Sequence, residues 1–191
     1  MSGLVLHCAT IDADCFAARL LLAVLGREYD TVAVDAYPGL DAESRQILTA
    51  GPLPIVRDGL VVVAGLRAVL EHLSGHASPS PWLDFACGEL AGVRRLRDRV
   101  LAGVLPTDGE LTAARQTLLR MEDERAVARL RGRRWFAGPE PGIADLALYP
   151  AVALSRDIDL EHDEFPALRG WLRDVRALAP AVHMPGVLDP I

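Results

Sequence analysis

The sequence predicts a small α/β domain followed by an all-helical domain. Short β-branched runs alternate with helical patterns up to about residue 75, and no strand pattern follows residue 81. Beyond that point apolar residues recur only at helical spacing. With 51% hydrophobic and 24% charged residues, the chain has the composition of a globular protein and not of a disordered one.

The first elements form a β-α-β unit. Residues 4–7 are predicted to form a short buried strand, and residues 29–35 form a second strand from β-branched residues. Between them, a helix is expected over about 15–25, and the glycine that follows it ends it. Asp12 or Asp14 can cap its N-terminus.

A β-hairpin is predicted after a short helix at 42–49. Apolar runs at 55–57 and 60–63 flank Asp58-Gly59, a strong short-range signal for a hairpin turn. A helix over 65–73 completes the unit. The order β-α-β-α-β-β-α is that of a thioredoxin-like domain.

The rest of the chain is predicted to be helical. We expect an α/β domain over 1–75, a linker at 76–81 within a stretch rich in Ser, Gly and Pro, and a helical domain over 82–191. A capping box at Thr107–Glu110 marks one helix start. The apolar spacing predicts helices over about 82–104, 108–130, 143–156 and 165–178.

Composition and charge exclude several classes of function. The net charge of −6 argues against sequence-independent nucleic-acid binding, which needs a basic face. No apolar run is long enough to span a bilayer and no signal-like segment opens the chain, so we expect a cytoplasmic protein without membrane contact. Every basic residue is Arg, and neither Lys nor Asn occurs, which favours a GC-rich bacterial source.

The cysteines argue against a metal site. Cys8, Cys15 and Cys87 form no C-x-x-C pair and no ligand cluster with His, so no metal is expected. An odd number of cysteines in a cytosolic chain favours free thiols over disulfides. Cys87 is predicted to lie in the core, because it occupies an apolar helix face.

Four segments carry a resemblance to a known family. The chain resembles the glutathione transferase family over essentially its whole length, in the hairpin AGPLPIV…DG, the helix end RAVLEHL, the element WFAG…GIADLALYP and the segment FPALRGW. Their order and spacing match the family. The resemblance implies the glutathione transferase fold, glutathione or another low-molecular-weight thiol as cofactor, a small-molecule substrate and a homodimer.

The resemblance places a thiol site at the hairpin, of which one half is kept. In the family, the residue before a cis-proline pairs its backbone with the thiol peptide, and here Leu53 precedes Pro54. The family's Glu-Ser pair, which holds the γ-glutamyl end, aligns with Gly65-Leu66. These residues offer no hydroxyl or carboxylate, so ordinary glutathione affinity should fall.

The resemblance places the activating residue near the start of the first helix. That position falls at Asp12, within the segment Asp12 to Cys15. Cys15 is either a reactive thiol at a helix N-terminus or a buried apolar residue. Asp12 and Asp14 are most simply helix caps, but either can serve as a general acid or base.

Other conspicuous residues are predicted to be structural. Asp145, three residues after Gly142, matches the family's buried capping box, although Gly142 lacks the usual hydroxyl. His7 is favoured as a structural residue of its strand. A run of arginines either binds an acidic substrate at the domain cleft or, as is usual for such runs, faces solvent; it comprises Arg94, Arg95, Arg97 and Arg99.

The favoured function is a divergent glutathione-transferase-like enzyme, a transferase or isomerase. It would conjugate, isomerise or add to a small electrophilic or apolar substrate in the interdomain cleft, in biosynthesis or detoxification, with or without glutathione. The alternative is a non-catalytic, dimeric binding or regulatory protein that keeps the fold. A cleft lined by reachable polar groups favours the enzyme, whereas a filled cleft with an exposed apolar patch elsewhere favours the binding protein.

Overall fold

The first half of the chain is built on a four-stranded sheet. The computed structural model describes residues 3–35, 42–77 and 79–185. The strands are β1 (Leu4–Cys8), β2 (Asp30–Ala33), β3 (Ile55–Asp58) and β4 (Val61–Ala64). Their order is β2-β1-β3-β4, with β1 parallel to β2 and the other pairs antiparallel. The predicted thioredoxin-like order of elements is confirmed.

The hairpin turn lies one residue further along than the sequence predicts. Asp58 pairs with Val61, so Gly59 and Leu60 are the two central residues of the turn. Gly59 has a φ of +61°, which suits the first central position of a tight hairpin. The sequence places the turn at Asp58-Gly59, but Asp58 still belongs to the strand.

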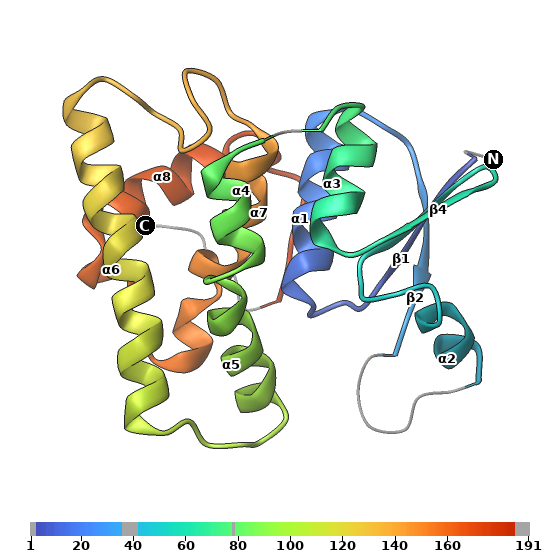
Figure 1. Cartoon of the computed structure of the whole chain (residues 1–191), viewed down its shortest axis with the longest axis horizontal. Helices are drawn as coiled ribbons and strands as arrows, with labels where there is room; N and C mark the ends of the chain where they lie inside the picture. Colours follow the sequence, from blue (N-terminus) through green and yellow to red (C-terminus); the bar gives the residue numbers. More distant parts are fainter. Residues whose placement is uncertain (1–2, 36–41, 78, 186–191) are drawn as a thin grey trace.

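Three helices accompany the sheet. They are α1 (Ala13–Val24), α2 (Ala42–Leu48) and α3 (Leu66–Ser74). Helices α1 and α3 lie between the sheet and the helical half, whereas α2 lies on the side of the sheet away from that half (Figure 1). The first turns of α1 and α3 therefore face the boundary between the two halves.

The described part of the second half contains five α-helices. These are α4 (Pro81–Cys87), α5 (Ala91–Leu101), α6 (Asp108–Leu130), α7 (Ile143–Ala153) and α8 (Pro166–Arg176). Short 3-10 helices at Ser155–Ile158 and His162–Glu164 connect α7 to α8. The expected helix over 143–156 thus ends at Ala153. None of the helices in the described ranges is long and apolar enough to cross a membrane.

The single helix expected over 82–104 is instead two helices, α4 and α5. Gly88 leaves helical geometry, with φ −98° and ψ −93°, while its N–H still donates to the Asp84 carbonyl at 2.8 Å. A Cβ at this position would lie 3.1 Å from that carbonyl oxygen, so a glycine is well suited to the break. Leu90 is fully buried just after it. Apolar periodicity continues across the break, which is why the sequence pattern does not reveal it.

One hydrophobic core joins the two halves. Buried residues of the sheet, α1 and α3 belong to the same cluster as those of the helical half. Phe16 on α1 contacts Tyr149 on α7, with 5.8 Å between ring centroids. Tyr149 in turn lies 6.2 Å from the Trp171 ring on α8. The division into domains at 1–75 and 82–191 stays a prediction.

Candidate functional site

A cavity of about 400 Å³ lies where the two halves meet. Asp14 from the first turn of α1 and residues 64–68 at the β4–α3 junction form one wall. Residues of α4 and α5 form the other. Its polar lining consists of Asp14, Arg67, Glu71, Cys87 and Arg94. Polar groups from both halves therefore converge on one concave site, the arrangement typical of an active site.

An ion pair between Asp14 and Arg94 crosses this boundary. The Arg94 Nε lies 2.8 Å from Asp14 Oδ1, and its Nη2 donates to the Ala86 carbonyl at 2.8 Å. Arg94 is only 7% exposed. Its Nη1 has no hydrogen-bond partner among the described residues. A buried cationic donor with unused capacity, lining a cavity, is suited to bind an anionic group.

Asp14 has an unusual pKa for a carboxyl group. Burial raises the pKa of Asp14 to about 6, the nearby Arg94 acts in the opposite direction, and the carboxylates of Asp12 and Asp98 add to the rise. The Asp14 side chain keeps 26% of its surface exposed. A partly accessible carboxyl with such a pKa is partly protonated near neutral pH and suits acid–base chemistry.

The other two candidates on α1 have structural positions. Asp12 caps the helix, because its Oδ1 accepts a hydrogen bond from the Cys15 N–H at 2.6 Å. Cys15 is fully buried and does not line the described interdomain cavity. Burial raises the pKa of the Cys15 thiol, and the neighbouring Cys8 and Asp12 act in the same direction. Of the three candidates, Asp14 is the one that the structure brings to the cavity.

Cys87 is predicted to lie in the core, but it is only partly buried: it packs against the core and also lines the cavity. Its side chain is half-buried at the end of α4, just before the break at Gly88. Burial raises the pKa of the Cys87 thiol, whereas the cations Arg67 and Arg94 oppose that rise. Because the break in the helix was not predicted, the exposure of its last residue was missed as well.

The hairpin residues expected to bind a thiol, Leu53 and Pro54, lie directly before β3 and next to the β4–α3 junction. The Leu53–Pro54 peptide bond is cis, as expected, and the Gly65 N–H donates to the Pro54 carbonyl at 2.9 Å. Within the described part of the chain, the backbone N–H and carbonyl of Leu53 make no hydrogen bond. They therefore remain available to a peptide-like ligand.

Gly65 and Leu66 supply no polar side chain to such a ligand. Gly65 has a φ of +87°, a conformation that favours glycine, and Leu66 is buried at the start of α3. The residues present thus fit the backbone half of a thiol peptide and not a charged γ-glutamyl end. Among the described residues no group of His, Cys, Asp and Glu forms a metal site.

The arginine run divides into buried and exposed members. Arg97, like Arg94, is buried: its Nε lies 2.7 Å from the Asp157 carboxylate, and its Nη1 donates to the Ile11 carbonyl at 2.8 Å. The expectation of a solvated run is therefore wrong for these two residues. Only Arg95 and Arg99 face solvent.

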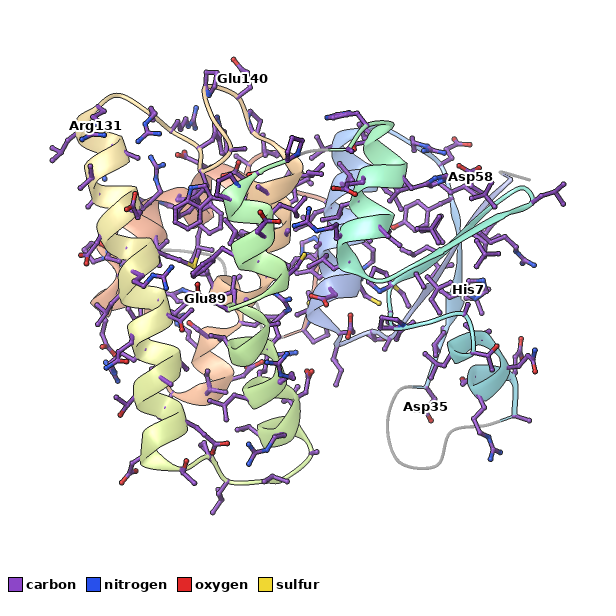
Figure 2. All side chains as sticks on the ribbon, viewed as in Figure 1. His7, Asp35, Asp58, Glu89, Arg131 and Glu140 are labelled. Carbon is purple, nitrogen blue, oxygen red and sulfur yellow. The ribbon has the colours of Figure 1, made fainter. Side chains whose placement is uncertain are left out.

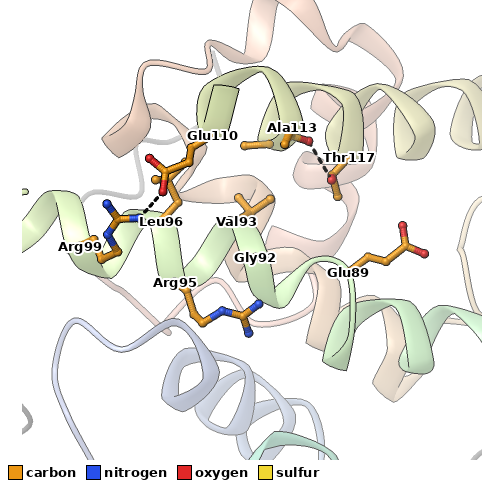
Figure 3. Close-up of a pocket in the computed structure, with 10 residues that line it drawn as sticks. Glu89, Gly92, Val93, Arg95, Leu96, Arg99, Glu110, Ala113 and Thr117 are labelled. Atoms are coloured by element: carbon orange, nitrogen blue, oxygen red, sulfur yellow. Dashed lines mark hydrogen bonds and ion pairs between the residues drawn. The ribbon is translucent and has the colours of Figure 1, made fainter. Parts of the chain in front are cut away.

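A second cavity, of about 410 Å³, lies between α5 and α6 (Figure 3). Arg99 pairs there with Glu110 across the two helices, and Glu89 pairs with Arg120. These charged groups form ion pairs with one another, and each is at least one-third exposed. This cavity is therefore a weaker candidate for an active site than the interdomain cavity. His7 is also remote, since it lies on β1 in the sheet (Figure 2).

Comparison with known proteins establishes the fold. Residues 108–174 match the family model of the glutathione S-transferase C-terminal domain. The chain carries a glutathione S-transferase C-terminal domain. The resemblance to the glutathione transferase family is thus confirmed. No curated protein sequence matches the chain at a significant level.

Solved structures extend the glutathione transferase fold to the whole chain. A possible glutathione S-transferase from Rhodopseudomonas palustris is 23% identical, with a TM-score of 0.72 over 99% of this chain and 98% of that one. A glutathione S-transferase from Pseudomonas fluorescens is 18% identical, with a TM-score of 0.78 over 100% of both chains. Ure2p in complex with glutathione is 19% identical, with a TM-score of 0.76 over 95% and 98%.

Proposed function

We propose that this chain is a divergent glutathione-transferase-like enzyme with Asp14 as its general acid or base. It conjugates, isomerises or adds to a small electrophilic or apolar substrate in the interdomain cavity, in a biosynthetic or detoxification pathway. The observation that carries this proposal is the partly accessible Asp14 carboxyl, with a pKa of about 6, beside Arg94.

Three polar groups divide the proposed roles. Asp14 transfers a proton to or from the substrate, Arg94 Nη1 holds an anionic group, and Cys87 lies within the same cavity as a contact residue. Addition and isomerisation both need a proton to move near neutral pH, which suits a carboxyl of raised pKa. Asp12 and Cys15 act indirectly, by fixing the first turn of α1.

A small thiol is the proposed cofactor. Ure2p, a protein of the same fold, has been solved with glutathione. In this chain the free backbone groups of Leu53, next to Pro54, would pair with a thiol peptide. Gly65 and Leu66 leave the γ-glutamyl end of glutathione without its usual partners. This should weaken the binding of glutathione and favours a different small thiol as the cofactor.

Titration calorimetry tests the thiol part of the proposal. The purified chain is titrated with glutathione, mycothiol and bacillithiol, each up to the millimolar range. We expect saturable binding of one thiol, weakened in Leu53→Pro, which removes a backbone donor. If none of the three binds, the thiol-dependent reading is rejected and thiol-independent chemistry at Asp14 remains.

Kinetics test the catalytic part. Two reactions of the bound thiol are measured from about pH 5 to pH 8: substitution on an aryl halide, which releases halide and the thiol proton, and addition to an enone, which places that proton on carbon. The wild-type rate should show an inflection near pH 6, and Asp14→Asn should lose roughly 100-fold in kcat. Glu89→Gln, outside the cavity, is the matched control and should retain the rate. Equal rates in wild type and Asp14→Asn would reject Asp14 as the catalytic group.

A non-catalytic dimeric binding protein is the second candidate. The edge strand β4 favours an interface, because Leu60, Val61 and Val62 are 103%, 50% and 54% exposed. We propose that a homodimer forms through this edge in the cytoplasm, a setting that the free cysteines favour. Sedimentation of wild type and Val62→Lys tests the dimer. The binding role would be supported over the enzyme if the protein is a dimer, binds none of the thiols, and shows the same rate in wild type and in Asp14→Asn.

A further inference from the structure

Five of the ten residues that line a cavity on the helical half are arginines. This cavity measures about 290 Å³ and lies between the C-terminal end of α6, the segment after it and α8. Its charged lining consists of Arg125, Arg129, Arg133, Arg134, Arg173 and Asp174. Figure 2 shows Arg131, from the same segment, at the end of α6 and on the far side of the helical half from the sheet. This arginine cavity is therefore separate from the interdomain site.

Arg125 is the buried member of the cluster. It is 4% exposed, its guanidinium lies 5.6 Å from the centre of the Phe136 ring, and its Nη2 donates to the Arg133 carbonyl. Its Nη1 has no hydrogen-bond partner in the described part of the chain. Burial lowers the pKa of Arg125, the carboxylates of Asp145 and Asp174 oppose that effect, and the nearby Arg133 and Arg129 add to it. A buried cation with an unused donor is unfavourable unless an anion completes it.

The carboxylates of the protein neutralise only part of this cluster. Asp174 is the single acidic residue of the lining, and it pairs with Arg134 at 2.7 Å. Arg129, Arg133 and Arg173 form no ion pair with any described residue. Their side chains are exposed, so they are free to move onto a ligand. In a chain of net charge −6, this concentration of positive charge is local and specific.

The chemistry of the cluster selects among anions. Guanidinium groups bind phosphate oxygens through paired, parallel hydrogen bonds. A single carboxylate has two oxygens and satisfies one such fork, whereas a phosphate group offers more oxygens and more charge to several arginines at once. Trp171, Ala167 and Gly170 complete the wall and leave room for a small organic part.

We propose that the arginine cavity binds a small molecule that carries a phosphate or diphosphate group. The ligand's phosphate oxygens accept hydrogen bonds from Arg125, Arg129 and Arg173. This site is independent of the proposed catalytic role of Asp14 and requires no thiol.

Calorimetric titration of the full chain with pyrophosphate tests this proposal. In ~150 mM salt, which screens exposed charges, we expect saturable binding of one pyrophosphate per chain. The double substitution Arg129→Gln/Arg173→Gln, both exposed positions, should weaken it by about tenfold or more. Arg131 lies next to the cavity but does not line it. The Arg131→Gln variant should therefore bind pyrophosphate with an affinity within about twofold of wild type.

Three results would overturn the proposal. The first is no saturable binding of pyrophosphate at millimolar concentration, and the second is equal weakening by Arg131→Gln, which would indicate general attraction. The third is tighter binding of citrate than of pyrophosphate, which would assign the cavity to carboxylates. Gly170→Glu gives an internal check, since a Cβ there would lie 3.7 Å from Arg129 Nη1. The new carboxylate should compete with pyrophosphate and abolish its binding.

Discussion

Single residues near the boundary of the two halves differ in reactivity because they differ in burial. Cys15 is fully buried and its pKa rises, so its thiolate is disfavoured. Asp14, one residue earlier, keeps part of its surface in the cavity. Its raised pKa has a consequence for stability as well as for catalysis, because the folded state binds a proton that the unfolded state has already lost.

We predict that stability falls as the pH rises across the range in which Asp14 loses its proton. The ordinary pKa is 3.8 and the folded value is about 6, so between these values the folded state holds more protons. The free energy of unfolding should therefore decrease with pH in this window, by on the order of 2 kcal/mol. Urea unfolding at a series of pH values from about 4 to about 7 measures this decrease. These limits span the ordinary and the folded pKa of Asp14.

Asp14→Asn is the comparison for that profile. Whatever its absolute stability, it should lack the part of the slope that Asp14 causes. Carbon-13 NMR of the labelled carboxyl groups gives a direct reading, with a midpoint near pH 6 that disappears in the variant. A midpoint near the ordinary value for aspartate, with parallel stability profiles, would contradict the prediction.

Asp145 should be among the most costly side chains to remove. It is fully buried and accepts hydrogen bonds from the Phe136, Ala137 and Gly142 N–H groups and from the Trp171 indole, at 2.8, 3.2, 3.2 and 2.9 Å. Asp145→Ala leaves these donors unpaired, so we expect a loss of about 3 kcal/mol or more in urea unfolding. Asp174→Ala, which breaks a partly exposed ion pair, should cost less than about 1 kcal/mol. Similar losses in both variants would refute this ranking.

At the scale of elements, the start of α7 has an unusual cap. Gly142 occupies the N-cap position and has no side chain to bind the first turn. A Cβ at Gly142 would lie 2.7 Å from the Ala137 Cβ, so the close approach of the preceding segment excludes the usual hydroxyl residue. The cap is then made from one side only, by Asp145.

We predict that restoring the missing cap hydroxyl destabilises the protein. Gly142→Ser should cost about 1–2 kcal/mol through crowding, although a serine cap alone stabilises a helix by about 1 kcal/mol. The double variant Gly142→Ser/Ala137→Gly removes the clash and should recover that loss. Thermal unfolding of the wild type, both single variants and the double variant measures the coupling. Additive effects would show that Ala137 is not the cause.

The sequence predicts the elements better than the site, for a physical reason. Periodicity and capping are local, so α1, with a cap at Asp12 or Asp14, and α6, with its Thr107 capping box, could be predicted from adjacent residues. The break at Gly88 keeps the apolar spacing and stays hidden. Arg97 contacts Ile11 and Asp157, far away in the sequence, and no local pattern reveals such a pair.

The two halves of the whole molecule depend on each other for their core. The fully buried Phe16 contacts Tyr149, and Trp171 lies behind that tyrosine. A fragment of the first half alone would expose the faces of α1 and α3 that are turned to the helical half. That exposed apolar surface removes much of the driving force for folding.

We therefore predict that residues 1–75 alone do not fold cooperatively. Calorimetry should give one transition for the full chain and none for the fragment, and the fragment's amide NMR spectrum should show little dispersion. The reconstituted mixture of both halves serves as the control for chain integrity. A well-dispersed spectrum of the isolated fragment, or two separate transitions in the full chain, would contradict the prediction.

The two buried arginines of α5 also determine how a ligand can reach the interdomain cavity. Arg94 forms an ion pair with Asp14, and Arg97 donates a hydrogen bond to the Ile11 carbonyl. Both arginines of α5 therefore bind the start of α1 and the segment just before it. Rotating one half away from the other would break both contacts at once. Such a rotation therefore costs the free energy of two buried contacts, which favours entry of a ligand through the opening that already exists.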